Sequence, residues 1–197
     1  MGKRLIVCCA AVSAITFLGC LHSFAEEGPS GLVSGIEVFT GFSSAELRRD
    51  QGNYDQIPLI LDIDFDLKPL VEKINLHLPM LLQCQLEPFI STVYKPDPNV
   101  EVGNAFALKI GLAPDTWAFQ PYVKAAMGMV YMTQHTIEQS TQFNFIEYGG
   151  IGLHYFFTKN WALSAEGRYR HLSNGGIDHP NTGINSYFAL AGVSYQF

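Results

Sequence analysis

Alternation of apolar and polar side chains is the dominant pattern along this chain. From Trp161 to Ser173 the odd positions are mostly apolar, whereas the even positions carry serine, glutamate and arginine. From Ile57 to Asp66 the odd positions hold isoleucine, leucine and phenylalanine, and three of the even positions are aspartates. A period of two is typical of a β-strand whose two faces meet different environments. The pattern therefore predicts strands with one apolar and one charged face.

Eight such segments follow one another along the sequence. Each has about the nine to eleven residues that a tilted membrane strand requires, or somewhat more. The sixth is the least regular, because Phe143 and Phe145 have the opposite parity to Ile146 and Tyr148. We expect an all-β protein: an eight-stranded antiparallel transmembrane β-barrel with a side-chain-filled interior. The predicted strands are approximately 32–44, 56–66, 82–94, 102–112, 117–133, 142–156, 160–173 and 184–197.

The charged rows should face the inside of this barrel. If the apolar rows face lipid, the acids of the second and third segments meet basic residues of later segments. An eight-stranded barrel is just wide enough for its side chains to fill it, so we expect paired charges and no pore. The basic residues expected in the interior are Lys109, Lys124, Arg168 and Arg170, and Glu87 and Glu166 are expected to be structural partners there.

The first 25 residues read as a secretory signal peptide. Lys3 and Arg4 precede an apolar run, and small residues end at Ala25, so residues 26–197 are expected to form the barrel. A cut before Cys20, which would make a lipoprotein, is the alternative. The formal net charge of −6 becomes −8 when Lys3 and Arg4 are removed, because the removed segment contains no acid. An acidic chain without a basic patch argues against nucleic acid as a partner.

An even number of strands would return both termini to the periplasm and place the longer loops outside the cell. The lengths agree, because the polar connections 45–55, 134–141 and 174–183 are long, whereas 113–116 and 157–160 are short. The exception is 67–81, which is long although it should be periplasmic. Its apolar residues have helical spacing and predict one or two interfacial helical turns.

The last two strands bring chemically competent side chains together. A symmetric hairpin through 174–183 sets Trp161 opposite Tyr195 and Tyr169 opposite Tyr187. Eight residues at ~3.3 Å, tilted by ~40°, separate these pairs by roughly 20 Å, close to the ~25 Å apolar band of such barrels. The same register places His171 opposite Asn185, one step further out. Ser173 follows on the same face, at the level of the outer lipid head groups.

Serine, histidine and an amide in this arrangement suggest nucleophilic catalysis. Histidine is suited to take the proton of a serine hydroxyl near neutral pH, and a third group must fix the imidazole tautomer. Asn185 could do so through its amide oxygen. The turn of Asn174, Gly175 and Gly176 offers backbone N–H groups, or the Asn174 amide, to a developing oxyanion. The other histidines have no ligand-like spacing, so neither a metal site nor a cofactor is predicted.

The run R-Y-R-H-L-S-N-G-G-I, followed by P-N-T-G-I-N, resembles the outer-membrane lipid A 3-O-deacylases, also called acyloxyacyl hydrolases or PagL-type enzymes. The resemblance covers about thirty residues near the C-terminus, and the rest of the chain agrees only in strand number and general character. It implies that His171 is the general base and Ser173 the nucleophile. It also implies that Asn174 and Gly176 belong to the oxyanion site.

The sequence departs from the family at one position, because Asn185 stands where the resemblance implies a glutamate. Three interpretations are open. The Asn185 amide alone orients the histidine, as in the amide-completed triads of papain-like proteases; another acid replaces it; or the protein is a weakly active or inactive relative. The acids considered as replacements are Glu87, Glu147 and Asp178.

The resemblance implies a carboxylic ester hydrolase that removes the 3-O-linked acyl chain of lipid A in the outer leaflet of the bacterial outer membrane. Its expected partners are lipid A or lipopolysaccharide as substrate and the outer membrane, with a homodimer as an open alternative. Two other functions stay under consideration: a phospholipase that cleaves glycerophospholipid esters, and a non-enzymatic barrel with a structural or adhesive role.

Overall fold

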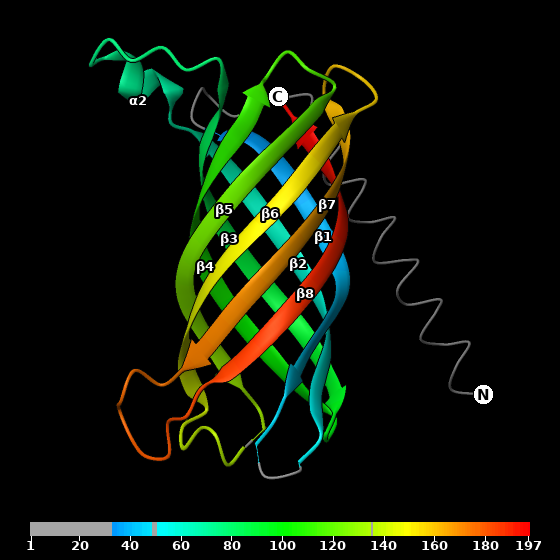
Figure 1. Ribbon diagram of the computed structural model, residues 1–197, viewed down its shortest axis with the longest axis vertical. Helices are drawn as coiled ribbons and strands as arrows, with labels where there is room; N and C mark the ends of the chain where they lie inside the picture. The colour runs from blue at the N-terminus through cyan, green and yellow to red at the C-terminus, as the bar shows by residue number, and fades with distance from the viewer. Residues whose placement is uncertain (1–32, 49–50, 135) are drawn as a thin grey trace, which may run out of the picture.

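The computed structural model describes residues 33–48, 51–134 and 136–197, in which eight strands close into an antiparallel barrel (Figure 1). Each strand pairs with its neighbours in chain order, and β8 closes the barrel on β1. The predicted architecture is confirmed, whereas the predicted signal peptide, 1–25, lies outside the described residues. The strands are β1 (Val33–Glu46), β2 (Asn53–Asp66), β3 (Met80–Lys95), β4 (Asn99–Pro114), β5 (Phe119–Met132), β6 (Phe143–Phe156), β7 (Trp161–Ser173) and β8 (Ile184–Gln196).

The two ends of the barrel differ in the length of their connections (Figure 1). We call the end that carries Val33 and Phe197 the terminal end; it holds the short connections 115–118 and 157–160. The opposite end, which we call the loop end, holds the connections 47–52, 96–98, 133–142 and 174–183. The connections predicted to be long, around 47–52, 133–142 and 174–183, lie together at the loop end, whereas 96–98 at that end is short and 67–79 at the terminal end is long.

A short helix interrupts the connection between β2 and β3 at the terminal end. This helix, α2 (Lys68–Glu72), has Pro69 in its first turn, where proline is tolerated because its missing N–H would be unpaired anyway. Leu70 and, just beyond the helix, Ile74 are exposed. The helical turn predicted from the spacing is confirmed. In the described part of the chain, no helix is long and apolar enough to cross a membrane.

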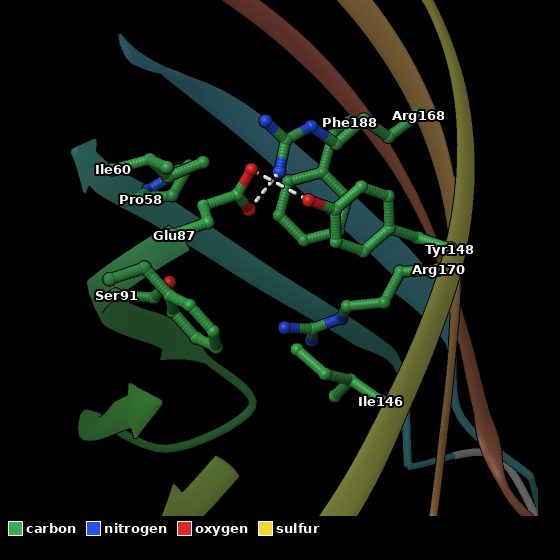
Figure 2. Close-up of a pocket in the computed structure, with 10 residues that line it drawn as sticks. Pro58, Ile60, Glu87, Ser91, Ile146, Tyr148, Arg168, Arg170 and Phe188 are labelled. Atoms are coloured by element: carbon green, nitrogen blue, oxygen red, sulfur yellow. Dashed lines mark hydrogen bonds and ion pairs between the residues drawn. The ribbon is translucent and has the colours of Figure 1, made fainter. Parts of the chain in front are cut away.

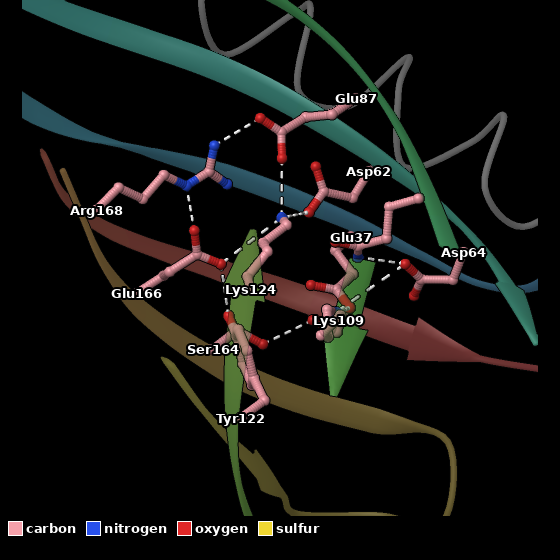
Figure 3. A network of polar contacts seen from close by, with 12 residues as sticks. Glu37, Asp62, Asp64, Glu87, Lys109, Tyr122, Lys124, Ser164, Glu166 and Arg168 are labelled. Atoms are coloured by element: carbon pink, nitrogen blue, oxygen red, sulfur yellow. Dashed lines mark hydrogen bonds and ion pairs between the residues drawn. The ribbon is translucent and has the colours of Figure 1, made fainter. Parts of the chain in front are cut away.

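Paired charges fill the middle of the barrel (Figure 3). Lys124 Nζ lies 2.7 Å from Asp62 and 2.8 Å from Glu87, and all three side chains are buried. Arg168 contacts the same Glu87 at 2.5 Å and also pairs with Glu166. These contacts join β2, β3, β5 and β7 across the lumen, as the sequence predicts.

Toward the loop end the interior contains an apolar cluster beside the buried Arg170–Glu101 ion pair. Tyr54, Val93, Met132, Ile146 and Leu172 belong to one cluster of buried residues that closes this end of the lumen. This cluster explains the parity conflict in β6. The sixth segment has no break in register, and its inward row is simply apolar near the loop end and glycine-rich further along.

One small internal cavity lies between the charged layer and the apolar cluster (Figure 2). Its volume is about 20 Å³, and its lining includes Glu87, Tyr148, Arg168 and Phe188. Such a volume holds about one water molecule. The side chains of the described residues therefore fill most of the interior of the barrel, as the sequence predicts.

Candidate active site

The β7–β8 hairpin positions the candidate site. Trp161 pairs with Tyr195, and Tyr169 pairs with Tyr187, so both predicted cross-strand pairs are confirmed. Their ring centroids lie 4.8 Å and 5.1 Å apart, within the range of favourable aromatic contacts. The two pairs mark two levels on the outer wall of the barrel, and the residues that follow Tyr169 come next toward the loop end.

His171 pairs with Asn185 across β7 and β8, as the hairpin register predicts. The two side chains meet on the outer wall, where His171 Nδ1 lies 2.6 Å from Asn185 Oδ1. An amide oxygen can only accept a hydrogen bond, so Nδ1 carries the proton and donates it. In the neutral ring, Nε2 is then free to accept a proton, which is the tautomer that a general base requires.

Ser173 lies two residues further along β7 on the same outward face, and its side chain is half-buried. It pairs with Phe145 of β6. Among the described residues, no hydrogen bond joins its hydroxyl to His171. Alternate residues of a strand are ~6.5 to 7 Å apart at Cα, a separation that the two side chains can bridge by rotation, and such catalytic bonds commonly tighten only when substrate is bound.

Gly183, which directly precedes β8, lies against the Cε1 edge of the His171 ring. Its φ is +75°, and a Cβ built there would overlap His171 Cε1 and lie 3.2 Å from Nε2. Only a glycine fits both this backbone conformation and this close approach. Sequence reasoning noted this glycine only as part of the motif. Its position two residues before the partner of His171 was the signal that could have indicated contact with the ring.

The turn after Ser173 is built from two glycines with positive φ. Gly175 and Gly176 have φ of 66° and 81°, and Ile177 N donates to Asn174 O over 3.2 Å. These features are those of a tight turn of type I′. The Gly176 N–H donates to the Asn174 side-chain oxygen over 2.9 Å. The predicted oxyanion residues Asn174 and Gly176 are thus adjacent to Ser173 and bonded to each other.

Asn174 is fully buried and fastens this turn to the neighbouring loop. Its backbone N–H donates to Asn181 Oδ1 at 2.9 Å and to Gln139 Oε1 at 3.1 Å. Its side-chain amide donates to Ser140 Oγ at 3.1 Å and to Asp178 O at 2.9 Å. The N–H of Gly175, by contrast, has no acceptor among the described residues. The turn behind the serine is therefore held in place by the β5–β6 connection.

The three acids considered as replacements for the missing glutamate occupy different places. Glu87 is buried in the lumen, where it contacts Lys124 and Arg168 on the far side of the wall. Asp178 lies in the 174–183 loop and accepts a bond from His179 N over 2.8 Å. Glu147 is exposed on the outer wall and is the residue of β6 that pairs with His171. Only Glu147 of these three shares both a face and a level with the histidine.

Other titratable residues are engaged in the lumen. His154 is buried, stacks on Tyr122 with a centroid distance of 4.6 Å, and lies 2.7 Å from the Ser164 hydroxyl. Within residues 33–48, 51–134 and 136–197, no group of three or more histidines, cysteines and acids is arranged to hold a metal ion.

Comparison with known proteins agrees with both the barrel and the motif. The sequence model of the lipid A 3-O-deacylase (PagL) family matches residues 82–194, more than half of the chain. No curated protein matches significantly. Among solved structures, the outer membrane enzyme PagL superposes with a TM-score of 0.58 and 18% identity, covering 81% of this chain and 98% of that one. Neisserial surface protein A superposes with a TM-score of 0.56 and 14% identity, covering 85% of this chain and 98% of that one. The N-terminal barrel of Pseudomonas aeruginosa OprF superposes with a TM-score of 0.51 and 14% identity, covering 85% of this chain and 100% of that one.

At these sequence identities the structural matches support the fold alone. Membership of a family rests on the match of the family model to residues 82–194. The closed barrel of eight strands agrees with these structural matches. The chain therefore belongs to the lipid A 3-O-deacylase (PagL) family, and its membership supports a lipid A deacylase activity in the bacterial outer membrane.

Proposed function

We propose that this protein hydrolyses the ester of the acyl chain at the 3-position of lipid A, with Ser173 as nucleophile and His171 as general base. The observation that carries the proposal is the 2.6 Å bond from His171 Nδ1 to Asn185 Oδ1, because it fixes the tautomer whose Nε2 faces away from Asn185. Ser173 lies on the same face of the same strand.

In the proposed reaction, His171 Nε2 takes the proton of the Ser173 hydroxyl as Oγ attacks the carbonyl carbon of the ester. The tetrahedral intermediate collapses when the carbon–oxygen bond to the sugar breaks and the imidazolium returns the proton to the departing sugar hydroxyl. A water molecule, deprotonated by His171, then attacks the acyl-serine. The second collapse releases a free fatty acid and restores the Ser173 hydroxyl.

Donors for the developing oxyanion come from the turn that follows the nucleophile. Asn174 and Gly176 are the proposed residues, and the N–H of Gly175 between them, which has no acceptor in the described part of the chain, belongs to the same turn. Because the N–H groups of Asn174 and Gly176 donate within the loop, the turn would have to adjust when the ester binds. Once turned toward the ester, such N–H groups would stabilise the negative charge that develops on its carbonyl oxygen.

We further propose that the loop end faces the cell exterior, so that His171 and Ser173 lie at the head groups of the outer leaflet. The filled lumen supports a lateral approach of the substrate, because a cavity of about 20 Å³ admits no acyl chain. Tyr169 and Tyr187, one step closer to the membrane centre, would then form the outer aromatic girdle.

The proposal is tested with purified protein in detergent micelles. Lipid A and a glycerophospholipid are offered separately, and the products are identified by mass spectrometry and by the position of the freed sugar hydroxyl. We expect one fatty acid to be released from the 3-position of lipid A, none from the phospholipid, and none by Ser173→Ala. Cleavage of the phospholipid, release from another position, or activity of Ser173→Ala would overturn the proposal.

A further inference from the structure

The histidine of the candidate site has a carboxylate on its second side. Antiparallel pairing of β6 with β7 sets Glu147 directly opposite His171, and pairing of β7 with β8 sets Asn185 opposite the same residue. Directly opposed residues have Cβ atoms about 4.5 to 5.5 Å apart. The imidazole therefore stands between an amide and a carboxylate, on three adjacent strands of the outer wall.

Glu147 is an unusual residue for its row. Its neighbours on the outward face of β6 are aromatic, aliphatic or glycine: Phe143, Phe145, Gly149 and Ile151. Among the described residues, Glu147 has neither a hydrogen bond nor an ion pair, in contrast to Asp55 at the rim, which lies 2.9 Å from Lys95. An uncompensated carboxylate on a lipid-facing row is unfavourable, so its presence beside His171 calls for a function.

The other charged and titratable groups around His171 are further away or turned inward. Arg170 points into the lumen, where it bonds Glu101 at 2.8 Å. Tyr169 and Tyr187 share the outward face one step toward the membrane centre. Ala45 pairs with Ser186, so Glu46, the next residue of β1, lies beside Asn185 and two strands from His171. Glu147 is thus the acid that strand pairing sets directly opposite His171 on the outer wall.

In a triad completed by an acid, one carboxylate both orients the histidine and stabilises the imidazolium. Here Asn185 and Glu147 together offer these two effects. The amide of Asn185 orients the ring through Nδ1 but carries no charge to stabilise the imidazolium that forms when Ser173 loses its proton. A carboxylate about one strand spacing away stabilises that cation without occupying either ring nitrogen, and strongly so at the water-poor edge of a membrane. Nε2 stays free for the serine.

We propose that Glu147 is a positioning residue that supplies the negative charge of the catalytic group, while Asn185 supplies the orientation. This inference rests on the proposed roles of His171 and Ser173. It assigns the function of the missing glutamate to two residues on opposite sides of the histidine, one from β6 and one from β8.

The test compares the wild type with Glu147→Gln and Glu147→Asp, using lipid A in detergent micelles. We expect Glu147→Gln to lower kcat about 10- to 100-fold with little change in KM, because the charge acts on the transition state. Because KM reports binding of lipid A and kcat reports the chemical step, a loss confined to kcat separates this role from a general loosening of the site. Glu147→Asp should restore part of the rate.

Asp97→Asn is the matched control. Asp97 is exposed at the loop end on the opposite wall of the barrel, in the connection between β3 and β4. Asp97→Asn therefore removes one negative charge, as Glu147→Gln does, but far from His171. We expect its rate to stay within about twofold of the wild type.

The proposal is overturned if Glu147→Gln keeps the kcat of the wild type, or if Asp97→Asn reduces kcat equally. Ser173→Ala is assayed alongside, so that a failure of the role of Glu147 can be distinguished from a failure of the proposed function. If Ser173→Ala is inactive and Glu147→Gln is fully active, only the role of Glu147 fails. If Ser173→Ala is active, the proposed function fails and the role of Glu147 with it.

Discussion

His171 donates the hydrogen of its Nδ1 atom to Asn185 Oδ1 over 2.6 Å, from one strand to the next on the outer wall of the barrel. The position of Asn185 is the one at which the family resemblance implies a glutamate. An amide oxygen accepts the same hydrogen bond as a carboxylate and fixes the same tautomer of the histidine. Asn185 therefore keeps the orientation that a glutamate would give to His171, but it lacks the negative charge of the carboxylate.

Replacing Asn185 by alanine should therefore lower kcat about 10- to 100-fold, because the ring loses the acceptor that holds it. Asn185→Asp, which keeps the acceptor and adds a charge, should retain or exceed the wild-type rate. Both variants are measured by release of fatty acid from lipid A. An Asn185→Ala protein with unchanged activity would show that the histidine is oriented by something else.

Gly183→Ala should abolish most of the activity while leaving the barrel folded. A Cβ at this position, where φ is +75°, would overlap the His171 ring and displace it from Asn185. Gly52→Ala is the matched control, because Gly52 also has a positive φ, 86°, and no atom within 4 Å of the added Cβ. We expect at least about a 100-fold loss for Gly183→Ala and little change for Gly52→Ala. Equal activities of the two variants would contradict a steric role for Gly183.

Lys124→Met should destabilise the barrel without changing the outer wall. Lys124 lies 2.7 Å from Asp62, 2.8 Å from Glu87 and 3.7 Å from Glu166, so its loss leaves buried carboxylates with too little positive charge. Removing one partner of a buried pair costs about 3 to 5 kcal/mol. The midpoint of urea unfolding in micelles, followed by tryptophan fluorescence, should fall accordingly.

Lys95→Met is the control for this stability measurement. Lys95 lies 2.9 Å from Asp55, and its own side chain is exposed to solvent, so its loss leaves water free to solvate the site and should lower the midpoint less than Lys124→Met does. If Lys124→Met were no less stable than Lys95→Met, the lumen network would not be a source of stability.

The sequence was sufficient to predict the barrel and the hairpin that carries His171. Strand faces follow from a period of two, and a symmetric hairpin has one natural register, so the pairs Tyr169–Tyr187 and His171–Asn185 followed directly. Parity fails where the lumen is apolar. Ile146 and Tyr148 point into the closed loop end, which made β6 ambiguous and hid the relation between Glu147 and His171.

Contacts between loops were also beyond prediction, for a different physical reason. The bonds of Asn174 to Gln139, Asn181 and Ser140 join segments that have no periodic pattern, and their geometry depends on the folded barrel beneath them. The hairpin register indicates that Gly183 is near His171, but the close contact with the ring depends on its positive φ, which the sequence does not display.

The central claim is that Ser173 removes the 3-O-linked acyl chain of lipid A, and the most direct test is the mass spectrum of lipid A from cells that express the wild type or Ser173→Ala. Folding of both proteins is compared in the isolated outer membranes. The account predicts a new lipid A species, lighter by one 3-position acyl chain, in wild-type cells and its absence in Ser173→Ala cells. Identical lipid A spectra from the two strains, with both barrels folded, would contradict it.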